Sequence, residues 1–229
     1  MHPIDASHLA PPPDQALDLD RWPRRSAYEL FRHFEKPWFG VCVRLDVAPL
    51  KAALAQRGGG RFSLACHYLA LHQAQQMATF RLRFDGEGVQ LLGRVHGSTT
   101  VARADGSFAF ATLPYEPGFA RFAARGATAM QAARDGTAGL ATVADEHRFL
   151  HFTTLPWLHF TSFAPARERQ HADIPKLAFG RVMADGPHQW MPLAVEVHHA
   201  LVDGGDVGAF VTGLETMLRE PSAWLDSET

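Results

Sequence analysis

The stretch LAVEVHHALVDGG, residues 193–205, sets two adjacent histidines after an alternating apolar run and follows them with Asp-Gly-Gly. Side chains along a β-strand point alternately to its two faces. His199 therefore shares a face with the apolar residues at 193, 195 and 197, and His198 points to the other face. We expect His199 to end a strand at the edge of a buried face, where an imidazole tends to have a shifted pKa and to meet a substrate in a partly desolvated cleft.

A purely structural interpretation of the same residues stays open. Asp203 is of a type favoured at the N-terminus of a helix, and Gly204-Gly205 suits a tight turn from a strand into a helix. His199 would then be a core histidine whose hydrogen bonds are satisfied. The residues alone do not separate the two interpretations, because a histidine with a perturbed pKa is only a probabilistic marker of a site.

Length and composition indicate how many domains the chain forms. The chain has 229 residues, of which 46% are hydrophobic and 20% charged, as in an ordinary globular protein with one sizeable core. Three consecutive prolines occupy positions 11–13. We therefore expect residues 1–20 to form an extended or partly ordered tail and residues 21–229 to form a single domain.

Charge and cysteine content argue against several classes of partner. The formal net charge is −2 and the basic residues are scattered, so we expect neither nucleic acid nor a membrane surface as a partner. Cys42 and Cys66 are too few for a disulfide framework, which favours a reduced compartment. The N-terminus lacks the features of a secretory signal, and no segment approaches the roughly 18 apolar residues of a membrane span. The expected location is the cytoplasm.

The pattern along the chain mixes helices and strands. Ser26 and Glu29 are spaced as a capping box, which predicts a first helix that begins at residue 26. Asp-Gly pairs at 85–86, 105–106 and 185–186 predict turns between strands. Strands are expected at 40–47, 148–154, 157–163, 179–184 and 190–198, and helices at 48–56, 63–78, 118–134 and 205–219. Such an order suggests an α+β sandwich with a mixed sheet.

Two familiar motifs are absent. The glycine-rich segment QRGGGR, residues 56–61, lacks the Lys-Ser/Thr of a phosphate-binding loop, so we interpret it as a plain loop. The 13 histidines include no H-E-x-x-H, and His67 and His72 are five residues apart, which does not align them on one helix face. We expect no metal site.

Three segments together resemble one enzyme family. HHALVDGG resembles the H-H-x-x-x-D-G signature of the chloramphenicol acetyltransferase family. RWPRRSAYELFRHF, from residue 21, is similar to that family's W-x-R-R opening, and TTLPWLHFTSF, residues 153–163, is similar to its S-A-L-P-W block. The three segments occur in the family's order and at its spacing, over about residues 20–220.

The resemblance implies a two-layer α+β sandwich that assembles as a homotrimer. Acetyl-CoA, as co-substrate, and a small-molecule acceptor would meet at the subunit interfaces. His199, the second histidine of the pair, takes the position of the general base that removes the proton from an acceptor hydroxyl. The implied activity is that of an acetyl-CoA-dependent O-acetyltransferase of the chloramphenicol type, an antibiotic-resistance enzyme.

The resemblance also assigns supporting residues. Asp203 and Arg24 would form an ion pair that holds the turn after the histidines. Thr153 takes the place of a serine whose hydroxyl donates to the tetrahedral oxyanion, and threonine retains that donor. Pro156 and Trp157 would lie beside the acetyl-CoA channel. On the residues alone, Arg24 could instead be a solvated charge, Thr153 an ordinary strand residue and Trp157 a core aromatic.

Departures from the family pattern concern the acceptor. Phe31 stands where the family has a tyrosine that helps to hold chloramphenicol, Gly205 where an aromatic follows the Asp-Gly, and Ala178 where a threonine is associated with a water. Phe108 retains an aromatic of the acceptor pocket. Because a pocket without its polar contacts binds the corresponding substrate less well, the acceptor is open between chloramphenicol and another small hydroxyl or amine compound. A non-catalytic trimeric binding protein is the remaining hypothesis.

Overall fold

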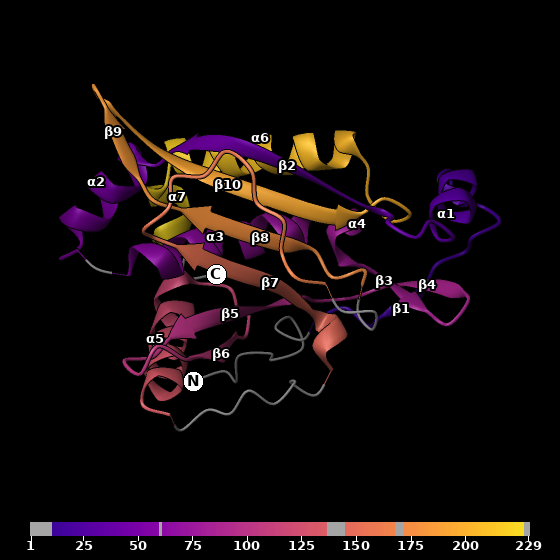
Figure 1. The fold of residues 1–229 in the computed structure, drawn as a ribbon, viewed down its shortest axis with the longest axis horizontal. Coiled ribbons are helices and arrows are strands. Elements are labelled where there is room, and N and C mark those ends of the chain that lie inside the picture. Colours follow the sequence, from indigo (N-terminus) through magenta and orange to yellow (C-terminus); the bar gives the residue numbers. More distant parts are fainter. Residues whose placement is uncertain (1–10, 60, 137–144, 168–171, 227–229) are drawn as a thin grey trace, which may run out of the picture.

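The computed structural model describes residues 11–59, 61–136, 145–167 and 172–226. A seven-stranded mixed sheet runs through the centre, in the order β2-β10-β8-β7-β5-β6, with β9 paired to the start of β10 (Figure 1). The β5–β7 and β7–β8 pairs are parallel and the others are antiparallel. The strands are β2 (Trp38–Asp46), β5 (His96–Ala102), β6 (Phe108–Leu113), β7 (Phe149–Leu155), β8 (Lys176–Gly180), β9 (Met183–Asp185) and β10 (His188–His198).

Helices cover one face of this sheet and enclose the core with it. α3 presents an almost unbroken buried surface from Leu64 to Leu71, and the rings of Phe152 and Phe179 on the sheet pack against its His67. Such all-round burial requires contacts on several sides, which α5, α6 and the sheet supply. The helices are α1 (Arg25–Phe31), α2 (Ala48–Gln56), α3 (Phe62–Gln76), α4 (Ala78–Arg81), α5 (Phe119–Arg134), α6 (Gly204–Arg219) and α7 (Ser222–Leu225).

A second, three-stranded sheet of order β1-β4-β3 consists of β1 (Gln15–Ala16), β4 (Gly88–Leu91) and β3 (Leu82–Asp85). β1 comes from the expected N-terminal tail, and Asp14 beside it forms an ion pair with Arg148. Residues 1–10 of that tail lie outside the described residues. No helix in the described segments is long and apolar enough to cross a membrane.

The turn predictions are confirmed. The Asp-Gly pairs join β3 to β4, β5 to β6 and β9 to β10. Gly86, Gly106 and Gly186 have φ values of 57°, 83° and 57°, a region that favours glycine because a Cβ atom would clash there.

Two predictions about elements are wrong. Residues 157–163 do not form a strand, because Pro156 starts a turn that the N–H of Leu158 closes on the carbonyl of Leu155. The predicted capping box does not form either. α1 begins at Arg25, so Ser26 lies inside the first turn, and Glu29 pairs with Arg25 instead of with a backbone N–H.

Candidate active site

His199 lies one residue beyond the end of β10, in the turn that leads to α6, so the expectation that it ends the strand is wrong by one residue. Its backbone N–H donates to the carbonyl of Pro37 at 2.8 Å. The imidazole is partly buried and stacks on Phe31, with ring centroids 3.9 Å apart and an angle of 13° between the planes. Phe39 packs against the ring at 4.8 Å. Two aromatic neighbours therefore fix the orientation of the imidazole.

His198 has a different environment. Its side chain is 4% exposed and meets Trp38 and Phe84 edge-on, and its Nδ1 accepts from the N–H of Ala200 at 3.2 Å. Burial lowers the pKa of His198 to about 4. The period-two pattern places the two histidines on opposite faces but does not predict this burial, because both faces of β10 are covered.

The turn after the histidines is tied to α1 and to α6. Arg24, directly before α1, pairs through Nη1 with the carboxylate of Asp203, and its Nη2 donates to the carbonyl of His199 at 3.2 Å. Asp203 is also the N-cap of α6, and its Oδ1 accepts from the N–H groups of Gly205 and Asp206 at 2.8 and 3.1 Å. The two interpretations of Asp203 are thus compatible, since one carboxylate caps the helix and binds Arg24.

Electrostatics follow from these contacts. Partial burial alone would raise the pKa of Asp203, but the N–H of Asp206 and the Arg24 cation outweigh it and hold that pKa below its ordinary value. A carboxylate that stays charged keeps both of its functions at neutral pH.

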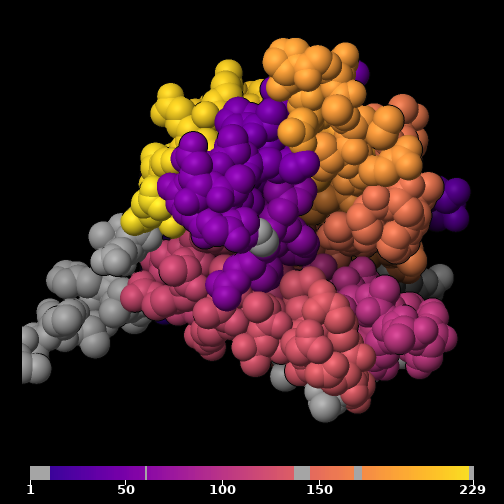
Figure 2. All heavy atoms as spheres, turned by 90° about the vertical axis from the view of Figure 1, so that its left-hand side faces the viewer, coloured from indigo at the N-terminus to yellow at the C-terminus, as the bar shows by residue number. Residues whose placement is uncertain are grey.

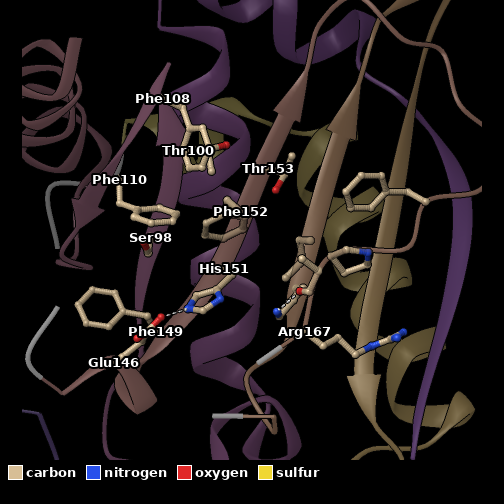
Figure 3. A pocket seen from close by; sticks show the side chains of 15 residues that line it. Ser98, Thr100, Phe108, Phe110, Glu146, Phe149, His151, Phe152, Thr153 and Arg167 are labelled. Carbon is tan, nitrogen blue, oxygen red and sulfur yellow. Dashed lines mark hydrogen bonds and ion pairs between the residues drawn. The ribbon is translucent and has the colours of Figure 1, made fainter. Parts of the chain in front are cut away.

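Thr153 is partly buried on β7 and lines a cavity of about 410 Å³, here called the acceptor-side cavity (Figure 3). This cavity lies on the sheet face away from the helices. Three hydroxyls line it, those of Ser98, Thr100 and Thr153, together with the rings of Phe108 and Phe110. Phe108, 48% exposed, is one of the aromatic side chains that line this cavity.

His199 and Thr153 of one chain are far apart. Thr153 is paired with Ala178 of β8, and Ala178 with Ala194 of β10, five residues before His199. A rise of about 3.4 Å per residue and a strand spacing of about 4.8 Å put the two Cα atoms about 20 Å apart. These two residues of one chain do not reach the same substrate atom.

Pro156 and Trp157 line a second cavity of about 610 Å³, here called the cofactor-side cavity. It lies where β5 and β7 separate, because their pairing ends at Thr99 and Phe152. Figure 2 faces this end of the molecule, where α2, α5 and the β9–β10 hairpin come together. Trp157 is 59% exposed, which does not fit a core residue.

The two cavities are neighbours. Thr100 and Phe108 line both. The acceptor-side cavity opens on one side of the sheet, and the helix-side residues Ser63 and Cys66 line the other cavity. This arrangement suits two substrates that approach from different sides. Among the described residues, no group of three or more His, Cys, Asp or Glu side chains could hold a metal ion.

The positions that depart from the family pattern are small or apolar. Ala178 is 1% exposed in the middle of the sheet. A Cβ atom on Gly205 would lie 3.2 Å from the Asp203 carboxylate, so the space there is restricted. No sequence motif singles out Glu146 and His151, which also line the acceptor-side cavity and which only the course of the chain brings together.

Comparison with solved structures identifies the fold. A chloramphenicol acetyltransferase superposes with a TM-score of 0.79 over 90% of this chain and 99% of its own, at 22% identity. The dihydrolipoamide acetyltransferase of Azotobacter vinelandii superposes with a TM-score of 0.66 over 98% of both chains, at 16% identity. The fold is that of this class of acyltransferases.

Sequence comparison defines the family within the class. The profile of the chloramphenicol acetyltransferase family matches residues 14–215. The chloramphenicol acetyltransferase of Streptomyces acrimycini is 28% identical over 97% of this chain and 100% of its own, and chloramphenicol acetyltransferase 3 of Escherichia coli is 24% identical over 88% and 95%. The chain belongs to the chloramphenicol acetyltransferase family, and is an acyltransferase.

Proposed function

We propose that the protein is an acetyl-CoA-dependent O-acetyltransferase that acts on chloramphenicol or a related small hydroxyl compound, as a cytoplasmic homotrimer. The observation that carries the proposal is the separation of the two half-sites. His199, oriented by Phe31 and by the Arg24–Asp203 pair, is about 20 Å from Thr153 in its own chain by the strand spacings. A neighbouring subunit that brings its His199 to the acceptor-side cavity would complete the site.

In this scheme His199 removes the proton of the acceptor hydroxyl as the oxygen attacks the thioester carbonyl of acetyl-CoA. The hydroxyl of Thr153 donates to the oxyanion of the tetrahedral intermediate. Collapse of the intermediate breaks the carbon–sulfur bond, and the imidazolium returns the proton to the leaving thiolate. The products are the acetyl ester and CoA. No acyl-enzyme is required.

The cofactor-side cavity suits the co-substrate. Its walls are mainly apolar, which suits the methylene and methyl groups of a pantetheine chain, and Pro156 and Trp157 lie along it. Arg134 and Arg181, both exposed, also line it and offer positive charge to the phosphates of CoA. The site residues of the proposal are thus His199 and Thr153 for chemistry, Arg24 and Asp203 for support, Pro156 and Trp157 for acetyl-CoA, and Phe31 and Phe108 for the acceptor.

The departures at positions 31, 178 and 205 favour a second candidate, the same chemistry on a different small alcohol or amine. The side chains at these positions contribute no hydroxyl to the site. Release of CoA, followed with a thiol reagent, distinguishes the two candidates when it is measured with and without chloramphenicol. A binding protein without turnover would release no CoA with any acceptor. Turnover of chloramphenicol would make the chain a resistance enzyme.

The first prediction concerns the base. His199→Ala should lower kcat by 10²–10⁴-fold, the usual contribution of a general base. His198→Ala, the matched control, should retain much more activity, because His198 is 4% exposed and packs against Trp38 and Phe84. Circular dichroism would verify that both variants are folded. The reverse order of activities would contradict the assignment.

The second prediction concerns the interface. His199→Ala and Thr153→Val chains should each be nearly inactive as pure trimers, but co-refolded mixtures should recover activity. A mixed trimer contains an interface with an intact His199 from one subunit and an intact Thr153 from the next. Activity that never exceeds the sum of the two pure variants would show that no such shared site exists.

A further inference from the structure

One of the three lysines of this chain lies in the acceptor-side cavity. The sequence contains Lys36, Lys51 and Lys176. Lys36 and Lys51 are exposed, whereas Lys176, the first residue of β8, is partly buried and lines the cavity. An amine of the chain itself therefore lies where the proposed reaction transfers an acetyl group.

Lys176 lies on the same face of the sheet as Thr153. β7 and β8 are parallel, with His151 paired to Lys176 and Thr153 paired to Ala178. Two residues along the strand and one strand across, the Cα atoms of Thr153 and Lys176 are about 8 Å apart. A lysine side chain reaches about 6 Å on its four-carbon stem. Its Nζ can therefore reach a carbonyl group that is bound beside the Thr153 hydroxyl.

The present contacts of the Lys176 side chain leave room for this movement. Nζ donates to the carbonyl of Ala166 at 2.5 Å. Because the stem has several rotatable bonds, a change of rotamer moves Nζ from Ala166 toward Thr153 while the backbone of β8 stays in place. The cavity, of about 410 Å³, is much larger than an acetyl group, so it has space for the thioester and the amine together.

We propose that the protein acetylates its own Lys176 when acetyl-CoA is bound and no acceptor fills the cavity. The amine reacts in its neutral form, after its extra proton has passed to water. Nζ bonds to the thioester carbonyl carbon, and the hydroxyl of Thr153 donates to the oxyanion. His199 of the partner subunit removes a proton from the attacking nitrogen and gives it to the thiolate as the carbon–sulfur bond breaks. The products are acetyl-lysine and CoA.

The modification has a consequence for activity. Acetylation removes the positive charge of Lys176 and adds an amide to the wall of the cavity. The added group occupies space that an acceptor needs, so a modified chain transfers acetyl groups more slowly. This inference rests on the proposed acetyl transfer at Thr153 and adds a modification site of the chain to it.

The test is incubation of the full chain with acetyl-CoA, without an acceptor, followed by mass spectrometry of the peptides that contain each lysine. Lys176 should gain an acetyl group faster than Lys36 and Lys51 by roughly 10²-fold or more, the lower end of what a general base contributes. Uncatalysed acetylation by acetyl-CoA would give the opposite order, because Lys36 and Lys51 are more exposed.

Two kinds of variant separate catalysis from simple exposure. His199→Ala should slow the acetylation of Lys176 by roughly 10²–10⁴-fold and leave that of Lys36 and Lys51 unchanged. Lys176→Arg keeps the positive charge but removes the amine, so incubation with acetyl-CoA should not lower its transfer rate below its own starting value. Lys51→Arg, the matched control, should lose activity during incubation as the unaltered chain does.

The outcomes distinguish this proposal from the proposed function. Equal acetylation of the three lysines, or acetylation of Lys176 that survives His199→Ala, would overturn the self-acetylation. Turnover of an acceptor with no acetyl group on Lys176 would overturn it as well and would leave the proposed function intact. Acetylation of Lys176 that depends on His199, in a chain that turns over no small acceptor, would support the self-acetylation while the proposed function fails.

Discussion

At the scale of single residues, Phe31 contacts two aromatic rings, those of His199 and Phe34. It stacks on the imidazole of His199, and it belongs to the proposed acceptor pocket. Phe34 packs edge-on against it at 5.0 Å, which limits its movement. A substitution at this position therefore acts on the base and on the acceptor together.

Phe31→Tyr restores the hydroxyl that the family has at this position. One neutral hydrogen bond contributes about 0.5–1.5 kcal/mol, so KM for chloramphenicol should fall roughly threefold to tenfold with little change in kcat. Phe31→Leu keeps an apolar side chain but removes the stacked ring, and should lower kcat. Steady-state kinetics of the three proteins decides the matter. An unchanged KM in Phe31→Tyr would mean that other groups hold chloramphenicol.

At the scale of elements, the first turn of α6 stabilises the turn that carries His199. The Asp203 carboxylate accepts from two N–H groups of the first turn, and Asp206 closes the capping box through the N–H of Asp203 at 2.9 Å. Arg24 joins this helix end to the start of α1 and to the carbonyl of His199. The same contacts therefore hold the start of α6 and the proposed base, His199.

Three substitutions separate the cap from the ion pair. Asp203→Ala removes both and should lower the free energy of unfolding most, by about 1–2 kcal/mol from the cap alone. Asp203→Asn retains an oxygen that can cap the helix but loses the charge, and Arg24→Ala retains the cap. Each should therefore lower the free energy of unfolding less than Asp203→Ala does, and each should still lower kcat. Thermal unfolding and kinetics provide the two readouts. Full activity and an unchanged Tm in Arg24→Ala would exclude a supporting role for the pair.

At the scale of the whole molecule, burial makes three histidines resist protonation. Burial lowers the pKa of His67 to about 3 and, with smaller contributions from nearby charges, those of His96 and His198 to about 4. His67 is 0% exposed, and neither of its ring nitrogens has a hydrogen-bond partner among the described residues. Unpartnered polar atoms in a core reduce stability.

The free energy of unfolding should therefore fall already at moderately acidic pH. Histidines of the unfolded chain bind protons near pH 6.5, whereas these three in the folded chain do so only near pH 3–4. The unfolded state binds more protons in this window, so the free energy of unfolding is greatest above pH 6.5 and falls as the pH drops toward 4. Urea unfolding at several pH values measures this slope. His67→Leu should flatten it by up to about 1.4 kcal/mol per pH unit and should not destabilise the protein at pH 7. An unchanged slope would show that His67 is hydrated in the folded state.

Local patterns in the sequence were enough for the parts of the fold that depend on neighbouring residues. The Asp-Gly turns follow from the φ values that glycine permits, β10 follows from the alternation of its side chains, and α5 follows from its alanine-rich composition. The wrong prediction of a strand at 157–163 also has a local cause. Composition favoured a strand at 157–163, but Pro156 and the closing bond from Leu158 make a turn there.

The sequence by itself determined the family, the order of most elements and the residue types of the site, because these depend on short motifs and on periodicity. Tertiary structure decided where those residues lie. The register of β7, β8 and β10 separates Thr153 from His199. Packing between segments that are distant in the chain stacks Phe31 on the imidazole and places Glu146 beside His151. Such contacts join residues that are distant in the chain, and their energies depend on strand pairing and burial that no local pattern encodes.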